Sequence, residues 1–412
     1  MIDMEQEVRH ALRSLLDPIE PPPSPRPQTV KRARFRRVAS ASLAGLTALV
    51  TVAVASWGTL ALRREASQNP PSSTSTVTFS LPEGSLVLQT ASGTELLRAG
   101  EEDSRSLGSG IRPHDLSPDG SRILGQVNDD LVAIAIDSGD REVLVSAPEE
   151  QSLGAFAEWS PDGGMVAYTV GAHPPEKSTL CLLTLSSAAT RCFPEAGSVY
   201  TLDWSSDGKR LVVAGPGNKP LYLLDPNTGD VSVGAGQEGD TPINDRLRSE
   251  DFGESVQLVG PTWSPSRRFL AGLASLRGSD YSYVPVVFTV EGQPVALGQP
   301  SGEFPEPFGW SPSEDLLAYT QGEAPYRITE AHVLDPVTDE DRHLVSSDGK
   351  RYPIITDLVW SPSGQWIALS LWDVKGDRER VTLRIIDADS GDVRETEVDV
   401  GGVTEPLVDW GP

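Results

Sequence analysis

Trp159-Ser-Pro-Asp-Gly163 is one copy of a short phrase that recurs seven times along this chain of 412 residues. The other copies are Leu116-Ser-Pro-Asp-Gly120, Trp204-Ser-Ser-Asp-Gly208, Trp263-Ser-Pro-Ser266, Trp310-Ser-Pro-Ser313, Trp360-Ser-Pro-Ser-Gly364 and Trp410-Gly-Pro412. Successive copies are 43, 45, 59, 47, 50 and 50 residues apart. Self-similarity at such a period indicates a repeat architecture with one supersecondary unit per copy.

The phrase has the chemistry of a tight turn between two strands. Proline pre-sets the backbone for a type I turn, and glycine supplies the left-handed residue that closes a bulged hairpin. β-Branched and aliphatic residues follow, as in Met165–Val170. A third apolar strand and an Asp/Gly-rich turn such as Asp225–Asp230 come next. Four short antiparallel strands per repeat predict a propeller blade, with the Trp packed between neighbouring blades.

The ends of the chain decide the number of blades. Six complete repeats separate the first phrase from the last, and the last phrase supplies only an innermost strand. The stretch Val77–Ala99 supplies three more, which we predict at Val77–Ser80, Ser85–Gln89 and Thr94–Leu97. We therefore predict an all-β, seven-bladed β-propeller closed by N- and C-terminal strands, which leaves no sheet edge open. A six-bladed ring is the alternative.

The repeated phrases resemble the WD40-like repeat of TolB-type propellers, which is also found beside the catalytic domains of prolyl-oligopeptidase-like peptidases. The resemblance covers roughly residues 76–412 and implies the fold, not an activity. The fourth to sixth copies lack the Asp of the phrase, and the fourth and fifth also lack its Gly, without a change in spacing.

An uncharged run of 25 residues, Val38–Leu62, precedes the repeats. As a helix it would span roughly 37 Å, against a hydrocarbon core of about 30 Å, so it predicts one transmembrane helix. Five basic residues between 31 and 37 precede the run and two follow it, which favours a cytoplasmic N-terminus and a propeller outside the cell membrane. The alternative is a secreted protein cleaved near Ala55, because Ala53-Val-Ala55 fits a small-x-small site.

We accordingly expect a cytoplasmic tail over 1–37, the transmembrane helix over 38–62, a flexible stalk over 63–75 and the propeller over 76–412. Asp3 can cap a short amphipathic helix over residues 4–16, which would need a partner surface to be stable. This helix, the proline-rich basic spacer and the single span resemble transmembrane anti-sigma factors, which implies a cytoplasmic signalling partner. A tail that only sets the topology is the alternative.

The net charge of the predicted propeller limits which partners it can bind. The first 64 residues hold 10 of the 34 Lys and Arg and 5 of the 59 Asp and Glu, so residues 65–412 hold 24 and 54, a balance of −30. Such a surface repels nucleic acid, so we exclude nucleic-acid binding. It confers solubility or attracts cationic partners.

The two cysteines predict a cross-strand disulfide. Cys181 and Cys192 flank the turn at Ser186-Ser187, and counting back from that turn sets one opposite the other. Disulfides persist in the extracytoplasmic compartments where we expect this domain. Two buried thiols are the alternative.

No pattern in the sequence predicts a metal, a cofactor or a catalytic residue. The five histidines show no ligand spacing, no Cys/His cluster occurs, and the Asp-rich turns lack the spacing of a calcium loop. No Gly-x-Ser-x-Gly elbow is present. Carboxylates at the central channel, as in propeller hydrolases or lyases, stay open as an enzymatic alternative.

Topology predicts where a partner would bind. The second turn of each blade and the connections between blades share one face, and these are the long, irregular segments. Variation on one face of a repeat fold is typical of a binding face. The sequence thus favours a non-enzymatic, membrane-tethered module that binds a protein, peptide or cell-wall glycan; an anti-sigma-like signalling protein is a further alternative. The binding candidates on this face are His173, Phe252, Tyr281, Tyr283, Tyr326, Arg327 and Trp372.

Overall fold

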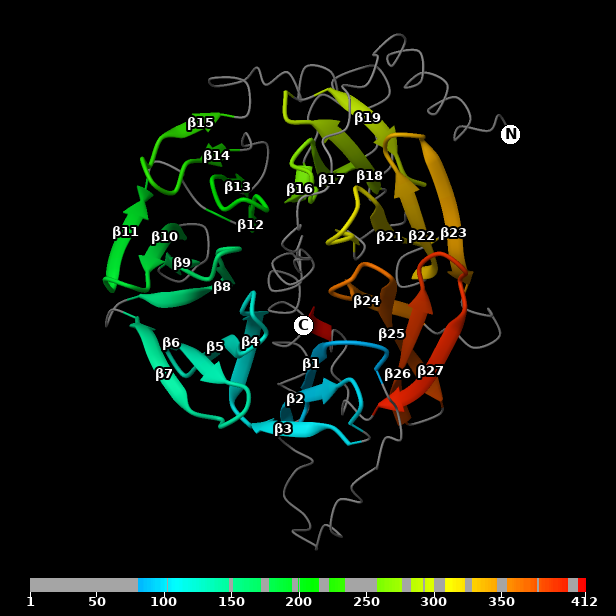
Figure 1. Ribbon diagram of the computed structural model, residues 1–412, viewed down its shortest axis with the longest axis horizontal. Coiled ribbons are helices and arrows are strands. Elements are labelled where there is room, and N and C mark those ends of the chain that lie inside the picture. Colours follow the sequence, from blue (N-terminus) through cyan, green and yellow to red (C-terminus); the bar gives the residue numbers. More distant parts are fainter. Residues whose placement is uncertain are drawn as a thin grey trace, which may run out of the picture.

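The seven sheets form a ring around a central axis in the computed structural model (Figure 1). The structure describes residues 81–412 except 102, 148–150, 172–177, 195–198, 200, 215–221, 234–257, 276–282, 292, 300–307, 323–327, 347–353, 376–377 and 399–406. Within these residues there are 28 strands in seven four-stranded sheets and no α-helix. The seven-bladed prediction is confirmed, and the six-bladed alternative is wrong.

We number the blades by the phrase that each contains, and each blade runs from the axis to the rim. Blades 1 to 3 comprise β4 (Ile111–Leu116), β5 (Arg122–Val127), β6 (Asp130–Ala135), β7 (Arg141–Ser146); β8 (Ser152–Trp159), β9 (Met165–Gly171), β10 (Thr179–Thr184), β11 (Ala189–Phe193); and β12 (Thr201–Trp204), β13 (Leu211–Ala214), β14 (Tyr222–Leu224), β15 (Val231–Val233).

Blades 4 to 6 repeat the same order of strands. They comprise β16 (Leu258–Trp263), β17 (Phe269–Ser275), β18 (Tyr283–Thr289), β19 (Pro294–Leu297); β20 (Phe308–Trp310), β21 (Leu317–Gly322), β22 (Ile328–Asp335), β23 (Glu340–Ser346); and β24 (Ile354–Trp360), β25 (Trp366–Lys375), β26 (Arg378–Asp387), β27 (Val393–Val398).

Blade 7 joins the two ends of the propeller, as predicted. The C-terminal strand β28 (Leu407–Gly411) pairs with β1 (Ser85–Thr90), which is followed by β2 (Gly93–Arg98) and β3 (Arg105–Gly108). The individual strand positions differ from the prediction. Ser85–Thr90 is the second strand of the blade and not the third, because it pairs directly with the innermost strand β28. The predicted strand Val77–Ser80 lies outside the described residues.

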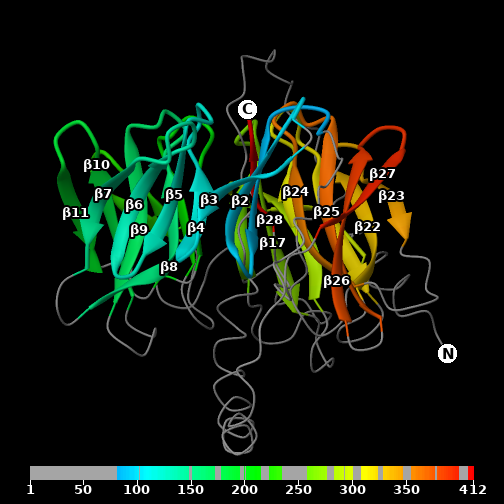
Figure 2. The same ribbon diagram turned by 90° about the horizontal axis from the view of Figure 1, so that it is seen from below.

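Antiparallel pairing gives the ring two distinct faces. The phrase turns and the third turns lie on one face, which we call the motif face; the second turns and the connections between blades lie on the other, which we call the loop face. The C-terminus marks the motif face in the edge-on view of Figure 2.

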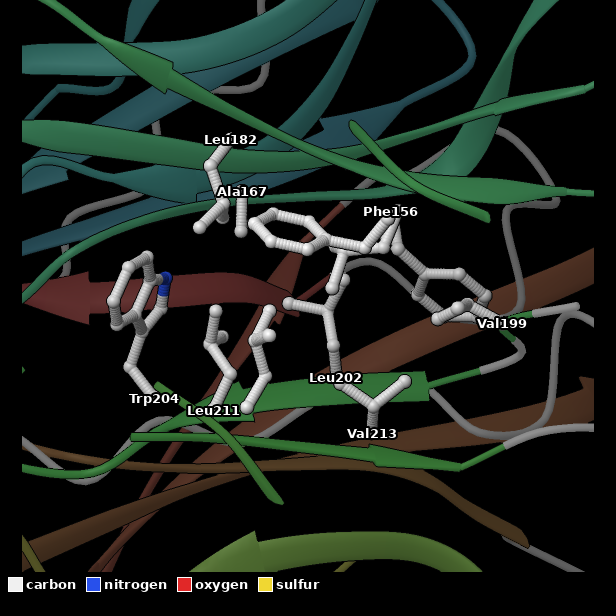
Figure 3. Close-up of a cluster of buried hydrophobic side chains, with 11 residues drawn as sticks. Phe156, Ala167, Leu182, Val199, Leu202, Trp204, Leu211 and Val213 are labelled. Carbon is white, nitrogen blue, oxygen red and sulfur yellow. The ribbon is translucent and has the colours of Figure 1, made fainter. Parts of the chain in front are cut away.

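The hydrophobic core is divided among the seams between blades. Figure 3 shows one seam, where Trp204 of blade 3 packs with residues of blades 2 and 3. Phe156 and Leu182 come from blade 2, and Leu202 and Val213 come from blade 3. The predicted packing of the phrase tryptophan between blades is confirmed. Each blade buries its faces only against its neighbours, so the ring must close to complete its core.

Cys181 and Cys192 lie directly opposite each other on β10 and β11, as the turn predicts. Their sulfur atoms are joined in a disulfide, and the chain has no free cysteine. Among the described residues no helix is long and apolar enough to cross a membrane. The predicted span at 38–62 and the predicted helix at 4–16 lie outside those residues.

Candidate functional site

The phrase turns are built by local hydrogen bonds that its residue types supply. In the first copy the Gly120 N–H donates to the Ser117 carbonyl at 2.8 Å. Asp119 Oδ1 accepts from Ser117 Oγ at 2.6 Å and from the Ser121 N–H at 3.0 Å. Gly120 has a φ of +72°, which favours glycine. The second and third copies repeat these contacts, so the phrase encodes a turn.

These hydrogen bonds hold the turn carboxylates ionised. The Ser117 hydroxyl and then the Ser121 N–H lower the pKa of Asp119 from 3.8 to about 2, despite some burial. Burial raises the pKa of Asp207, but the Lys209 N–H, the Ser205 hydroxyl and Arg267 outweigh it, so the net shift is downward. Asp119 and Asp207 therefore act as ionised acceptors in their turns.

Neighbouring phrase turns also contact one another around the axis. Three glycines face a proline of the adjacent phrase: Gly120 faces Pro412, Gly163 faces Pro118 and Gly208 faces Pro161. Further links are polar: Ser206 Oγ donates to the Pro265 carbonyl at 2.8 Å, and the Ser266 N–H donates to Asp315 Oδ1 at 3.1 Å. The sixth turn places Gly364 against Ser311 and Ser313. We call this continuous ring of contacts the turn belt.

The turn belt is completed by a phrase that is split between the two ends of the propeller. Trp410 lies near the end of the C-terminal strand, and Pro82-Glu83-Gly84 continues the turn from the N-terminal side. The Trp410 indole N–H donates to the Glu83 carbonyl at 2.8 Å, and Gly84 has a φ of +67°. Glu83 Oε1 also accepts from the Ser363 N–H of blade 6 at 3.2 Å. Sequence reasoning missed this half-phrase, although Pro82-Glu-Gly-Ser85 reads like Pro118-Asp-Gly-Ser121.

Carboxylates of the inner strands tie one blade to the next. Asp115 Oδ2 accepts from the Trp159 N–H at 2.7 Å, and Asp203 Oδ2 accepts from the Trp263 N–H at 2.7 Å. Asp357 Oδ2 accepts from the Leu407 N–H at 3.1 Å. Each innermost strand has an unpaired edge toward the axis, and buried N–H groups there need acceptors.

These contacts matter for the alternative that carboxylates at the central channel are catalytic. Asp115 is 5% exposed, and Asp203 and Asp357 are each 2% exposed. The other oxygen of two of these carboxylates also accepts an N–H. Asp115 Oδ1 accepts from the Leu116 N–H at 2.9 Å, and Asp357 Oδ1 accepts from the Leu358 N–H at 3.0 Å. The acids are thus engaged in holding the ring together, which accounts for them without catalysis. Among the described residues no group of three His, Cys, Asp or Glu side chains is arranged to hold a metal ion.

Five of the predicted binding residues, His173, Phe252, Tyr281, Tyr326 and Arg327, lie outside the described residues. Tyr283 opens β18 at the loop face, half-buried against the seam between blades 4 and 5. Burial raises its pKa above 10. Its ring therefore supports the core as well as reaching the surface, which makes it a poor probe of binding.

Trp372 belongs to a feature that the sequence did not predict. The segment 372–378 reads as an irregular second turn, but β25 and β26 each extend to ten residues and pair as far as Lys375 and Arg378. Trp372 is held in this hairpin opposite Ile354 and Val381. The inner pair β12 and β13 of blade 3 has four residues per strand. Blade 6 thus carries a long two-stranded extension on the loop face, and Trp372 is part of it.

Comparison with known proteins identifies the fold. No protein-family model matches the chain, and no curated protein matches it in sequence. An oligogalacturonate lyase in complex with manganese superposes with a TM-score of 0.56 and 12% identity, over 75% of this chain and 87% of that one. An oligogalacturonate lyase from Vibrio parahaemolyticus gives a TM-score of 0.51 and 12% identity, over 76% and 84%.

These likenesses show the fold alone. TolB from Acinetobacter baumannii is also among the similar structures, with a TM-score of 0.46 and 15% identity over 80% of this chain and 67% of that one. The comparisons lend no support to the resemblance to transmembrane anti-sigma factors, whose counterpart residues lie outside the described part of the chain.

Proposed function

We propose that this chain is a non-enzymatic, membrane-tethered binding or sensor module that works outside the cytoplasm. It engages a protein, peptide or cell-wall glycan through the loop face of its propeller. The cytoplasmic helix predicted at residues 4–16 passes the binding event to a partner inside the cell.

One observation carries this proposal: the two faces of the ring are used differently. The motif face is occupied by the turn belt, whose glycines, prolines and carboxylates are committed to contacts between blades. The loop face carries the irregular segments of the sequence and the long β25–β26 hairpin. Loop segments that differ in length and composition from blade to blade can vary to fit a ligand.

The position of residues 81–84 supports an orientation in which the loop face points away from the membrane. Leu81 is buried in the seam between blades 6 and 7, and Gly84 lies against Gly411 on the motif face. The chain that precedes residue 81 therefore joins the propeller on that side. A membrane anchor at 38–62 would attach there, and the loop face would be directed away from the membrane, toward a partner.

A capture experiment tests the proposal. The full-length protein is expressed in its native membranes, crosslinked and purified, with Trp372→Ala, Arg327→Ala or Tyr281→Ala compared with the unchanged chain. We expect these variants to lose a specifically captured partner, because large aromatic and arginine side chains dominate binding energy at interfaces. Tyr283 is not substituted, because it is half-buried and its loss could lower both the stability of the propeller and the binding of a partner.

Val337→Ala is the matched control. Val337 is 51% exposed in the third turn of blade 5, on the motif face, so its removal should leave both folding and capture unchanged. Capture that survives all three loop-face changes but is lost with Val337→Ala would reject the loop face as the site. Protease protection of the N-terminal tail in sealed vesicles separately tests the orientation in the membrane.

A further inference from the structure

The segment Leu81–Gly84, which we call the strap, leads the chain into β1. It lies at the seam between blades 6 and 7. Leu81 is buried there in one cluster with Leu383 of blade 6 and Trp410 of blade 7. At the other end of the strap, Gly84 faces the Pro362 side chain of the blade 6 phrase. The strap is therefore packed against both blades.

Glu83 is the polar centre of the strap. Its carbonyl accepts from the Trp410 indole N–H at 2.8 Å, which holds the motif-face end of β28. Its Oε1 accepts from the Ser363 N–H at 3.2 Å and also from the Ser363 hydroxyl, in the phrase turn of blade 6. One residue thus joins the C-terminal strand to the neighbouring blade, through its backbone on one side and its side chain on the other.

The strand that the strap holds is not joined to its neighbour by a turn. In the other described sheets, neighbouring strands are consecutive along the chain, whereas β28 pairs with β1 from the opposite end of the propeller. The register of this pair shifts between Val87 and Leu88. At the loop-face end of β28, the Leu407 N–H donates to Asp357 Oδ2 of blade 6 at 3.1 Å. Noncovalent contacts therefore keep β28 in blade 7, with the strap at one end and Asp357 at the other.

These contacts make the strap and β28 depend on each other. A strand held by a few noncovalent contacts opens locally at a lower free energy than the rest of the core. When β28 leaves its place, the Trp410 indole no longer reaches the Glu83 carbonyl, and when the strap leaves, Trp410 and Ser363 both lose an acceptor. Such coupling is reciprocal, because each element is more stable while the other is in place.

We propose that the strap couples the chain that precedes residue 81, which leads to the predicted membrane span at 38–62, to the closure of the ring at blade 7. While the strap is in place β28 stays paired, and displacement of either one makes the other open more readily. A partner that tightens or loosens the seam between blades 6 and 7 then seats or releases the strap. This last step rests on the proposed function, whereas the coupling between the strap and β28 does not.

Hydrogen exchange of single backbone amides in the full-length chain tests the coupling without a partner. The Ser363 N–H reports on the strap, and the Leu407 N–H reports on the far end of β28. Glu83→Ala removes the side-chain acceptor of Ser363 but keeps the backbone carbonyl that Trp410 uses. We expect this variant to exchange the Leu407 amide about fivefold faster than the unchanged protein, although Leu407 lies at the opposite end of β28.

The reciprocal variant is Trp410→Phe, which removes the indole N–H that the Glu83 carbonyl accepts and keeps an apolar ring. It should speed exchange of the Ser363 amide to a similar extent. Glu83→Gln keeps the Oε1 acceptor, so both amides should exchange nearly as in the unchanged protein. Glu142→Ala is the matched control, because it removes an exposed acid from blade 1 and should leave both amides unchanged.

Faster exchange of Ser363 in Glu83→Ala with no change at Leu407 would overturn the proposal, as would unchanged exchange of Ser363 in Trp410→Phe. Equal changes in Glu142→Ala would also reject it. If Trp410→Phe fails to fold, the response of Leu407 to Glu83→Ala and its recovery in Glu83→Gln decide the question. Coupled exchange in a protein that captures no partner would reject the proposed function alone, and uncoupled exchange in a protein that still captures one would reject the strap alone.

Discussion

Asp115 of blade 1 accepts a hydrogen bond from the backbone N–H of Trp159 in blade 2, at 2.7 Å and in a buried site. The contact joins two innermost strands that do not share a sheet. Asp203 of blade 3 makes the equivalent bond to the Trp263 N–H of blade 4. The residue that precedes the phrase therefore contributes to ring closure as directly as the phrase itself.

Removal of this acceptor should destabilise the ring. Asp115→Ala leaves the N–H groups of Leu116 and Trp159 without their carboxylate partner in a buried site. We expect a loss of about 2–3 kcal/mol in the free energy of unfolding, measured by urea denaturation. Glu142→Ala breaks an ion pair with Arg122 whose side chains are 62% and 47% exposed, and it should cost less than about 0.5 kcal/mol. Equal effects of the two substitutions would contradict a tie between blades.

The split seventh phrase makes a second prediction about closure. Gly84 combines a φ of +67° with a close approach to the Gly411 carbonyl oxygen, which a Cβ would strike. Gly100 has a φ of +82° with open space around it, so Gly100→Ala carries the backbone strain without the collision. We expect Gly100→Ala to cost about 1 kcal/mol and Gly84→Ala clearly more, because β28 must shift away from β1. Matching urea midpoints for both variants would show that the two ends do not meet in this way.

The disulfide should contribute to stability rather than to function. Cys181 and Cys192 close a loop with a sequence separation of 11 on the two outer strands of blade 2. Loss of a link over so short a loop is expected to cost about 2–3 kcal/mol in the Cys181→Ala, Cys192→Ala variant. A thiol assay under non-reducing denaturing conditions should find none in the unchanged protein. Two titratable thiols would instead support the alternative of free cysteines.

The lowered pKa of Asp119 predicts that its contribution to the free energy of unfolding is lost in acid. Because the folded-state pKa is about 2 against 3.8 for the free side chain, the stabilisation is complete above pH 4 and is lost as pH falls from about 4 toward 2. The group is exposed, so solvent screening reduces the contribution to the order of 1 kcal/mol. The difference in unfolding free energy between Asp119→Asn and the unchanged protein should therefore shrink between pH 6 and pH 3. A difference that grows on acidification would reverse the assigned sign.

Most of the fold could be predicted from the sequence because the phrase sets both a turn and a period. Blade number, ring closure, the interblade position of Trp204 and the register of Cys181 with Cys192 follow from spacing and turn chemistry. The strands of blade 7 could not be placed correctly, since the phrase there is divided between Trp410 and Pro82. A pattern interrupted by both chain ends leaves no continuous repeat to recognise.

The candidate site was less predictable, for a physical reason. The inner carboxylates contact residues 44 to 60 positions away, and such pairs carry no local periodicity. Similarly, β25 pairs with β26 as far as Lys375 and Arg378, although the sequence alone reads as a turn from Trp372 onward. Turn chemistry predicts where a strand can end, but cross-strand pairing decides whether it does.

We propose that the protein binds its partner on the loop face, opposite the phrase turns. Its most direct measurement is site-specific photo-crosslinking of the full-length chain in native membranes. The photoreactive residue is placed at Asp129 or Tyr281 on the loop face, and at Val337 or Ser390 on the motif face. We expect a partner adduct from the loop-face positions and none from Val337 or Ser390. Adducts from Val337 or Ser390, with none from Asp129 or Tyr281, would contradict it.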